Sequence, residues 1–201
     1  MDNEQITNQI TDRILYLSGD IDNCNTAKIA EQILKIIEMD RHGMATYCNY
    51  KLIPIQLNIQ SFGGSINDMW ALIDIIETST TPIITICSGY CMSAASLIFM
   101  AGHARYMYKH SSLMLHQMSV FNGGKMNDFK LDEKNFEKMH KRIMKYIKKH
   151  TKLGKKFFKR FDKAKEDVYL SAKKCLKYEI CDEIIDPSDI REELLSVLSG
   201  K

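Results

Sequence analysis

Three short segments of this 201-residue chain join an apolar, strand-like run to a turn that carries glycine, serine or histidine. They are residues 60–65 (QSFGGS), 88–96 (SGYCMSAAS) and 113–117 (LMLHQ). If the three runs are strands of one parallel sheet, their carboxyl ends meet at one edge and bring these polar groups together. Such a grouping is typical of an active site.

Ser93 and His116 are the candidate nucleophile and general base. Ser93 would stand at the start of a helix, where unpaired N–H groups and the helix dipole favour developing negative charge. Taken alone, a serine at a helix start is more often only an N-cap, and a histidine after an apolar strand is more often a core residue. The two together form the pair that nucleophilic catalysis requires, so the combination carries the prediction.

Two further groups would complete such a site. They are backbone N–H donors for an oxyanion and a carboxylate that orients the histidine base. The turn at Gly63 and Gly64 would present unobstructed backbone N–H groups, although two adjacent glycines often form only a turn. A histidine base needs a carboxylate that orients its ring. Asp167 stands beside an apolar turn rather than in a run of charges, while Asp162 and Asp182 compete with it on composition alone.

The hydrophobic periodicity predicts an α/β fold in which strand–turn–helix units repeat three times around a mostly parallel sheet. The predicted strands are 13–17, 53–59, 83–87, 106–108, 113–115 and 181–185. The predicted helices are 26–38, 65–76, 93–100, about 127–149, a short one from 171, and 189–198. Residues 39–50 are predicted to be a loop, and we expect a single domain over residues 1–201.

The predicted helix of about 127–149 is longer than a core helix usually is. Four apolar residues lie on one side of it: Phe136, Met139, Ile143 and Ile147. We expect a stripe of this length to exceed what one small domain can cover. The helix should therefore project from the body or dock on a partner.

Positive charge is concentrated in residues 141–165, which hold twelve Lys or Arg against one acid, Asp162, although the net charge of the chain is only +3. One interpretation is a solvated helix face, and the other is a surface for an acidic partner or for nucleic acid phosphates. Aromatic residues occur there as Phe157, Phe158 and Phe161, at spacings that suit a buried stripe as well as base stacking. The indication of nucleic acid binding is therefore weak.

Composition favours a compact protein of the cytoplasm. With 45% hydrophobic and 26% charged residues, the chain can bury a full core. Its N-terminus is polar and acidic, unlike a secretory signal, and its longest apolar stretch is about half of what a bilayer requires. The six cysteines form no CxxC pair and favour free buried thiols over a disulfide or metal set. We expect no metal or organic cofactor and no membrane partner.

Longer runs around these motifs resemble the proteolytic subunit of the Clp ATP-dependent protease, a serine peptidase with a crotonase-like core. The resemblance covers about residues 12–186 and is carried by GGS, SGYCMSAAS, AGHARYMYKHSSLMLHQ and EDVYLSAKKCLKYEICDEII. It implies a triad of Ser93, His116 and Asp167, with the backbone N–H groups of Gly64 and Ala94 as the oxyanion hole.

The resemblance also implies an assembly. The long helix would correspond to the handle that interleaves two stacked seven-membered rings and closes a chamber around the active sites. ATP would belong to a partner, an AAA+ unfoldase, since the chain has no GxxxxGK[ST] motif. The short segment before the first strand and an insertion around residues 40–50 change surfaces that would contact such an unfoldase, so a stand-alone peptidase stays open beside it.

At three positions the chain departs from the family pattern: Phe62 and Met118 replace prolines and Ala95 replaces a glycine. These changes alter the shape of the pocket more than its chemistry. The predicted function is therefore a serine endopeptidase that cleaves unfolded or flexible polypeptides inside a homo-oligomeric chamber. Three alternatives stay open: a stand-alone or phage-type processing peptidase of this fold, a crotonase-fold acyl-CoA enzyme, and a non-catalytic assembly or nucleic-acid-binding subunit.

Overall fold

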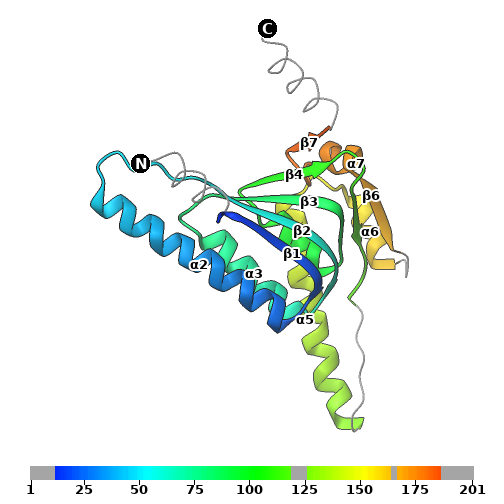
Figure 1. The fold of residues 1–201 in the computed structure, drawn as a ribbon. Helices are drawn as coiled ribbons and strands as arrows, with labels where there is room; N and C mark the ends of the chain where they lie inside the picture. The colour runs from blue at the N-terminus through cyan, green and yellow to red at the C-terminus, as the bar shows by residue number, and fades with distance from the viewer. Residues whose placement is uncertain (1–11, 119–125, 164–166, 187–201) are drawn as a thin grey trace.

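Strands and helices alternate along the chain in the computed structural model, which describes residues 12–118, 126–163 and 167–186 (Figure 1). The strands are β1 (Ile14–Ile21), β2 (Ile55–Gly64), β3 (Ile83–Met92), β4 (Ala104–Tyr108), β5 (Ser112–Leu115), β6 (Val168–Ser171) and β7 (Glu183–Ile185). The helices are α2 (Asn23–Thr46), α3 (Ile66–Thr78), α4 (Ala94–Met100), α5 (Met126–His150), α6 (Lys155–Lys163) and α7 (Ala172–Lys177). The predicted α/β fold is confirmed, and the helix predicted at 189–198 lies outside the described residues.

A mostly parallel sheet forms the centre, with the order β1-β2-β3-β4-β7. Strand β5 pairs in parallel with the last residues of β3, and β6 pairs antiparallel with β5. The strands predicted at 106–108 and 113–115 both exist, but each pairs with β3 rather than with the other. The carboxyl ends of β2, β3 and β5 therefore come together, as the sequence predicts.

Helices α2 and α3 lie together on one side of β1 and β2, and α4 packs against β2, β3 and α3 (Figure 1). Between these layers lies a core of large side chains that are fully buried, including Leu17, Ile33, Ile59, Ile73 and Phe99. Burial of each such side chain contributes about 1.5–3 kcal/mol of hydrophobic stabilisation. This core holds the strands rigidly in place beneath the turns that end them.

Helix α2 is longer than its sequence predicts, since it continues through residues 39–46, which were expected to form a loop. The cause is a buried ion pair. Asp40 is fully buried and accepts hydrogen bonds from Arg13 Nη1 (2.9 Å), Thr81 Oγ1 (2.6 Å) and Tyr50 Oη (2.5 Å). Burial by itself would raise the pKa of Asp40, but these hydrogen bonds together lower it below its ordinary value. The carboxylate therefore stays charged and ties α2 to the start of β1.

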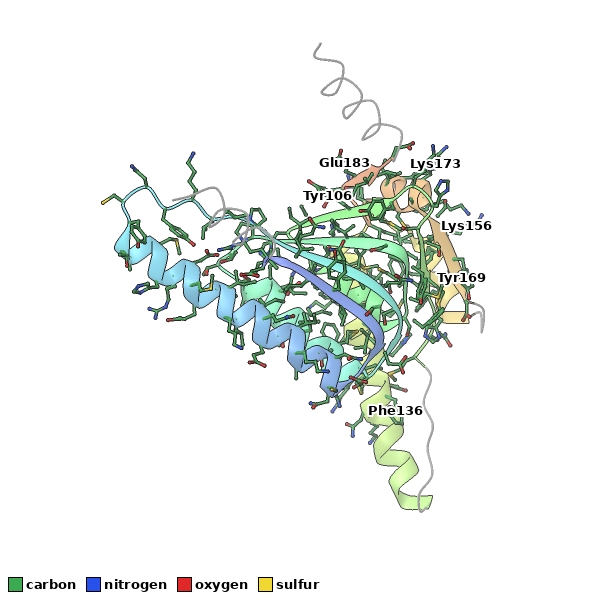
Figure 2. The ribbon with its side chains drawn as sticks, viewed as in Figure 1. Tyr106, Phe136, Lys156, Tyr169, Lys173 and Glu183 are labelled. Carbon is green, nitrogen blue, oxygen red and sulfur yellow. The ribbon has the colours of Figure 1, made fainter. Side chains whose placement is uncertain are left out.

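Helix α5 agrees with the predicted helix of about 127–149, but only part of it projects. Its C-terminal half packs on the body, where Met144, Tyr146 and Ile147 are buried. Its N-terminal half extends below the body, where Phe136 is labelled (Figure 2). The expectation that the whole apolar stripe exceeds one protomer is wrong for Ile147, because this residue is fully buried in the hydrophobic core of its own chain.

Part of the charge of residues 141–165 is compensated within the protomer. Lys149 faces Glu77 across 3.8 Å, and Lys152 pairs with Glu179. The guanidinium of Arg142 lies 3.9 Å from the ring centroid of Trp70, in cation–π geometry. On α6, Phe158 and Phe161 are buried, which favours the interpretation of an amphipathic helix with a solvated basic face.

All six cysteines lie in the described part of the chain, and all are free thiols. Four are buried as expected, whereas Cys24 and Cys48 are exposed. Burial raises the pKa of the Cys181 thiol to about 11, which makes it a poor nucleophile at neutral pH.

Within residues 12–118, 126–163 and 167–186, no cluster of His, Cys, Asp or Glu is arranged to hold a metal ion. No helix of these residues combines the length and apolarity needed to span a bilayer.

The Arg13–Asp40 pair generates the first prediction. Asp40→Ala should lower the free energy of unfolding at pH 7 by about 3–5 kcal/mol, because it leaves the buried Arg13 guanidinium without its partner. Since folding lowers the pKa of Asp40, the stabilisation is present above the unfolded pKa of about 3.9 and is lost as the pH falls through the folded value. Urea unfolding at several pH values measures both effects.

Glu38→Ala is the matched control, because it removes a helix carboxylate whose pairing with Arg41 is exposed. It should change the free energy of unfolding far less. Equal effects of the two substitutions would contradict the role assigned to the buried pair.

Candidate active site

Ser93 occupies the turn between β3 and α4 in a backbone conformation that serines rarely adopt, with φ 53° and ψ −124°. Such a conformation costs about 1–3 kcal/mol and persists only where the surrounding structure enforces it. Its N–H donates to the carbonyl of Met114 (2.9 Å), and its carbonyl accepts from the N–H of Ser96 (3.0 Å). The side chain makes no capping hydrogen bond, so Ser93 does not serve as an ordinary N-cap.

The Ser93 hydroxyl instead faces His116, which follows β5. Nε2 of His116 lies 2.7 Å from Oγ of Ser93. The parallel pairing of Met92 with Met114 sets this geometry, because it places the two following segments side by side. With a proton on Nδ1, the imidazole can accept the hydroxyl proton at Nε2.

Asp167 stands immediately before β6, and its Oδ1 lies 3.9 Å from Nδ1 of His116. The antiparallel pairing of Leu115 with Val168 brings these two side chains to the same place. The separation suits an ion pair but is longer than a hydrogen bond. Of the competing carboxylates, Asp182 is engaged by Arg105 Nη2 at 2.6 Å, and the Asp162 side chain lies outside the described structure.

The two glycines do not form the predicted turn. Strand β2 continues through Gly63 and Gly64, which have φ values of +106° and +149°. A Cβ on Gly63 would lie 2.7 Å from Cβ of Ser93 and 3.0 Å from the backbone N of Ala94. Only a glycine allows the end of β2 to approach the start of α4 this closely. After it, Ser65 caps α3, since its Oγ accepts from the N–H of Asp68 (3.3 Å).

A narrow cleft opens beside the Ser93 hydroxyl. Its lining is almost entirely apolar and comes from α3, α4, β5, the following turn and α5: Ile66, Met69, Leu97, Leu115, Met118, Ile143 and Ile147. Such a lining favours an apolar side chain next to the reacting group. Gln117 donates through Nε2 to the carbonyl of Phe161 (2.9 Å), which fixes the segment after His116 against α6.

The structure brings Ser93, His116 and Asp167 together in space, whereas most of the cleft lining was not among the predicted site residues. Ile143 was assigned only to the stripe of a long helix, and Met118 only to a change of pocket shape. Leu97 could have been found, since it lies one helical turn after Ser93 on a short helix that begins at the site.

The parallel sheet and the close approach of a glycine-bearing strand end to the serine turn define an α/β protein of the crotonase-like fold. A serine–histidine contact lies where its strands end. Comparison with known protein families agrees with this fold. The model of the family described as Clp protease matches residues 2–188. The chain belongs to the Clp protease family.

Curated relatives support the same family. The chain is 25% identical over 182 residues to the "ATP-dependent Clp protease proteolytic subunit 1" of Bifidobacterium longum, covering 87% of this chain and 71% of that protein. It is 26% identical over 179 residues to the proteolytic subunit of Deinococcus radiodurans, covering 88% of this chain and 82% of that protein. The subunit of Chlorokybus atmophyticus is 33% identical over 121 residues, which cover 57% of this chain and 47% of the algal protein. The match thus spans about half the length of that relative.

Proposed function

We propose that this protein is a serine endopeptidase that cleaves unfolded or flexible polypeptides, as a proteolytic subunit of a Clp-type protease. The observation that carries the proposal is the 2.7 Å contact between Ser93 Oγ and His116 Nε2. Membership of the Clp protease family supports it. The apolar cleft beside the pair provides a place for a substrate side chain.

In the proposed reaction, Ser93 Oγ attacks the carbonyl carbon of the scissile bond while its proton passes to Nε2 of His116. The same proton then goes to the leaving amine as the C–N bond breaks, which leaves an acyl-enzyme. A water molecule, activated by His116, hydrolyses that ester and restores the serine. Asp167 keeps the proton on Nδ1, and its carboxylate would approach to about 2.8 Å in the substrate complex, where catalytic hydrogen bonds commonly tighten.

The backbone N–H groups of Gly64 and Ala94 are the proposed oxyanion hole. Ala94 opens α4, and Gly64 directly follows Gly63, on which a Cβ would lie 3.0 Å from the backbone N of Ala94. Donors of this kind stabilise the tetrahedral intermediate, and loss of one typically lowers turnover by about 10²–10³-fold. The chemistry of these steps uses groups of the chain and water.

An oligomeric chamber completes the proposal. Phe136, on the projecting half of α5, and Met139, which follows it near the middle of the helix, are only partly covered by their own protomer. We assign them to the contact between two stacked rings, with seven subunits in each, so that the active sites face an enclosed space. Because the matched relatives are named ATP-dependent, an AAA+ unfoldase is the proposed partner that delivers substrate.

The catalytic assignment predicts that Ser93→Ala abolishes hydrolysis of a fluorogenic peptide while the melting temperature and the particle mass stay unchanged. Asp167→Asn should lower kcat by up to about 10⁴-fold, because the amide favours the wrong imidazole tautomer. Asp182→Asn is the control, since that carboxylate binds Arg105 away from the site and should affect stability rather than turnover. Activity retained in purified Ser93→Ala protein would refute the assignment.

The assembly proposal predicts a particle many times the 23.2 kDa protomer by light scattering. Phe136→Glu should yield smaller species of low activity, because it places a carboxylate in an apolar contact. Asn135→Glu adds the same charge at an exposed neighbouring position and should leave the mass unaltered. A fully active protomer, or equal behaviour of the two variants, would overturn the role of α5 in assembly.

A further inference from the structure

Strand β3 changes register just before it reaches Ser93. Ile59 of β2 is opposite Cys87, whereas Ser61 is opposite Cys91. Over this stretch β2 advances two residues and β3 advances four, so β3 holds a bulge of two extra residues. Gly89 lies in the bulge with a φ of +82°, a conformation that suits glycine.

The bulge is also the point at which β3 changes its neighbour. Residues 84–87 pair with β4, and residues 90–92 pair with β5. The part of β3 that leads into Ser93 is therefore aligned on β5, the strand that leads into His116. Its alignment depends on how the backbone is held at residues 88–89.

The buried hydroxyl of Ser111 binds β3 at the point where this strand changes its neighbour. Ser111 is 3% exposed and comes immediately before β5. Its Oγ donates to the carbonyl of Cys87 (2.8 Å) and accepts from the N–H of Gly89 (3.0 Å). A single side chain thus binds the last residue paired with β4 and the bulge that follows it.

A second contact supports the bulge from β2. The ring of Phe62 stacks on the ring of Tyr90 with centroids 4.3 Å apart and an interplanar angle of 27°. Tyr90 is the first residue of β3 that pairs with β5. The ring stack therefore joins β2 to the residue of β3 that follows Gly89, while the Ser111 hydroxyl binds β3 at Cys87 and Gly89.

We propose that Ser111 is a positioning residue that sets the distance between the nucleophile and the general base. The segments 87–93 and 111–116 run in parallel and are joined at one end by the Ser111 hydroxyl and at the other by the Ser93 N–H to Met114 carbonyl bond. Without the first link, the extra residues of the bulge can shift and carry Ser93 away from His116. The catalytic consequence rests on the proposed function, whereas the geometric one does not.

The test compares Ser111→Ala with Thr85→Val. Thr85 lies on the same strand, is fully buried and donates through Oγ1 to the carbonyl of Phe99 (2.7 Å), so both variants lose one buried hydroxyl. Both should melt at lower temperature. Only Ser111→Ala should lower kcat by at least about tenfold with KM nearly unchanged, since a displacement of about 1 Å in a reacting group can cost about 100-fold.

Ser111→Thr keeps the hydroxyl and should restore most of the turnover. If Ser111→Ala does not fold, Gly89→Ala perturbs the same bulge through its φ, and its added Cβ meets nothing closer than 3.9 Å. That variant should show the same loss of kcat with KM nearly unchanged.

Crystal structures of the wild type and Ser111→Ala provide a readout that does not depend on peptidase activity. The separation of Ser93 Oγ from His116 Nε2 should increase from hydrogen-bond length to beyond about 3.5 Å in the variant. An unchanged separation, or a kcat in Ser111→Ala equal to that of Thr85→Val, would overturn the positioning role. An inert wild type with the predicted shift in the variant would overturn the proposed function and leave the positioning role supported.

Discussion

The close approach of β2 to the turn that carries Ser93 is the constraint on which the rest of the structure depends. A Cβ on Gly63 would lie within 2.7 Å of the Cβ of Ser93, so the two segments meet with no room for a side chain between them. The core beneath β2 and β3 enforces this contact, and Ser93 adopts its unfavourable φ of 53° within it. The turn therefore directs the hydroxyl toward β5 rather than toward its own helix.

Strand β5 lies between β3 and β6 and pairs with both of them. Its parallel pairing with β3 places His116 beside Ser93, and its antiparallel pairing with β6 places Asp167 beside His116. Three side chains from distant parts of the chain are thus aligned by backbone hydrogen bonds rather than by flexible loops. As a result, Ser93 and His116 are already at hydrogen-bond distance, whereas Asp167 and His116 are 3.9 Å apart.

Local sequence patterns predicted the fold, and they indicated three positions that the structure places near one another. Ser93, His116 and Asp167 each follow or precede an apolar strand, and parallel topology alone brings such positions together. The prediction ended α2 near residue 38 because residues 39–50 hold Gly43 and mixed polar residues. Among these is Asp40, whose carboxylate is buried against Arg13 and Thr81, which are both distant in the sequence. Ser111 was missed for a similar reason, since its two partners are decided by a register shift that no local pattern reveals.

The most direct test of the serine assignment is reaction of the wild-type protein with a fluorophosphonate, followed by intact-mass analysis and peptide mapping. Activated serines react readily with such reagents because a neighbouring base takes the hydroxyl proton. We expect one adduct in each chain, on Ser93, and no adduct in a folded His116→Ala variant. An unmodified wild-type chain, or an adduct confined to another residue, would contradict it.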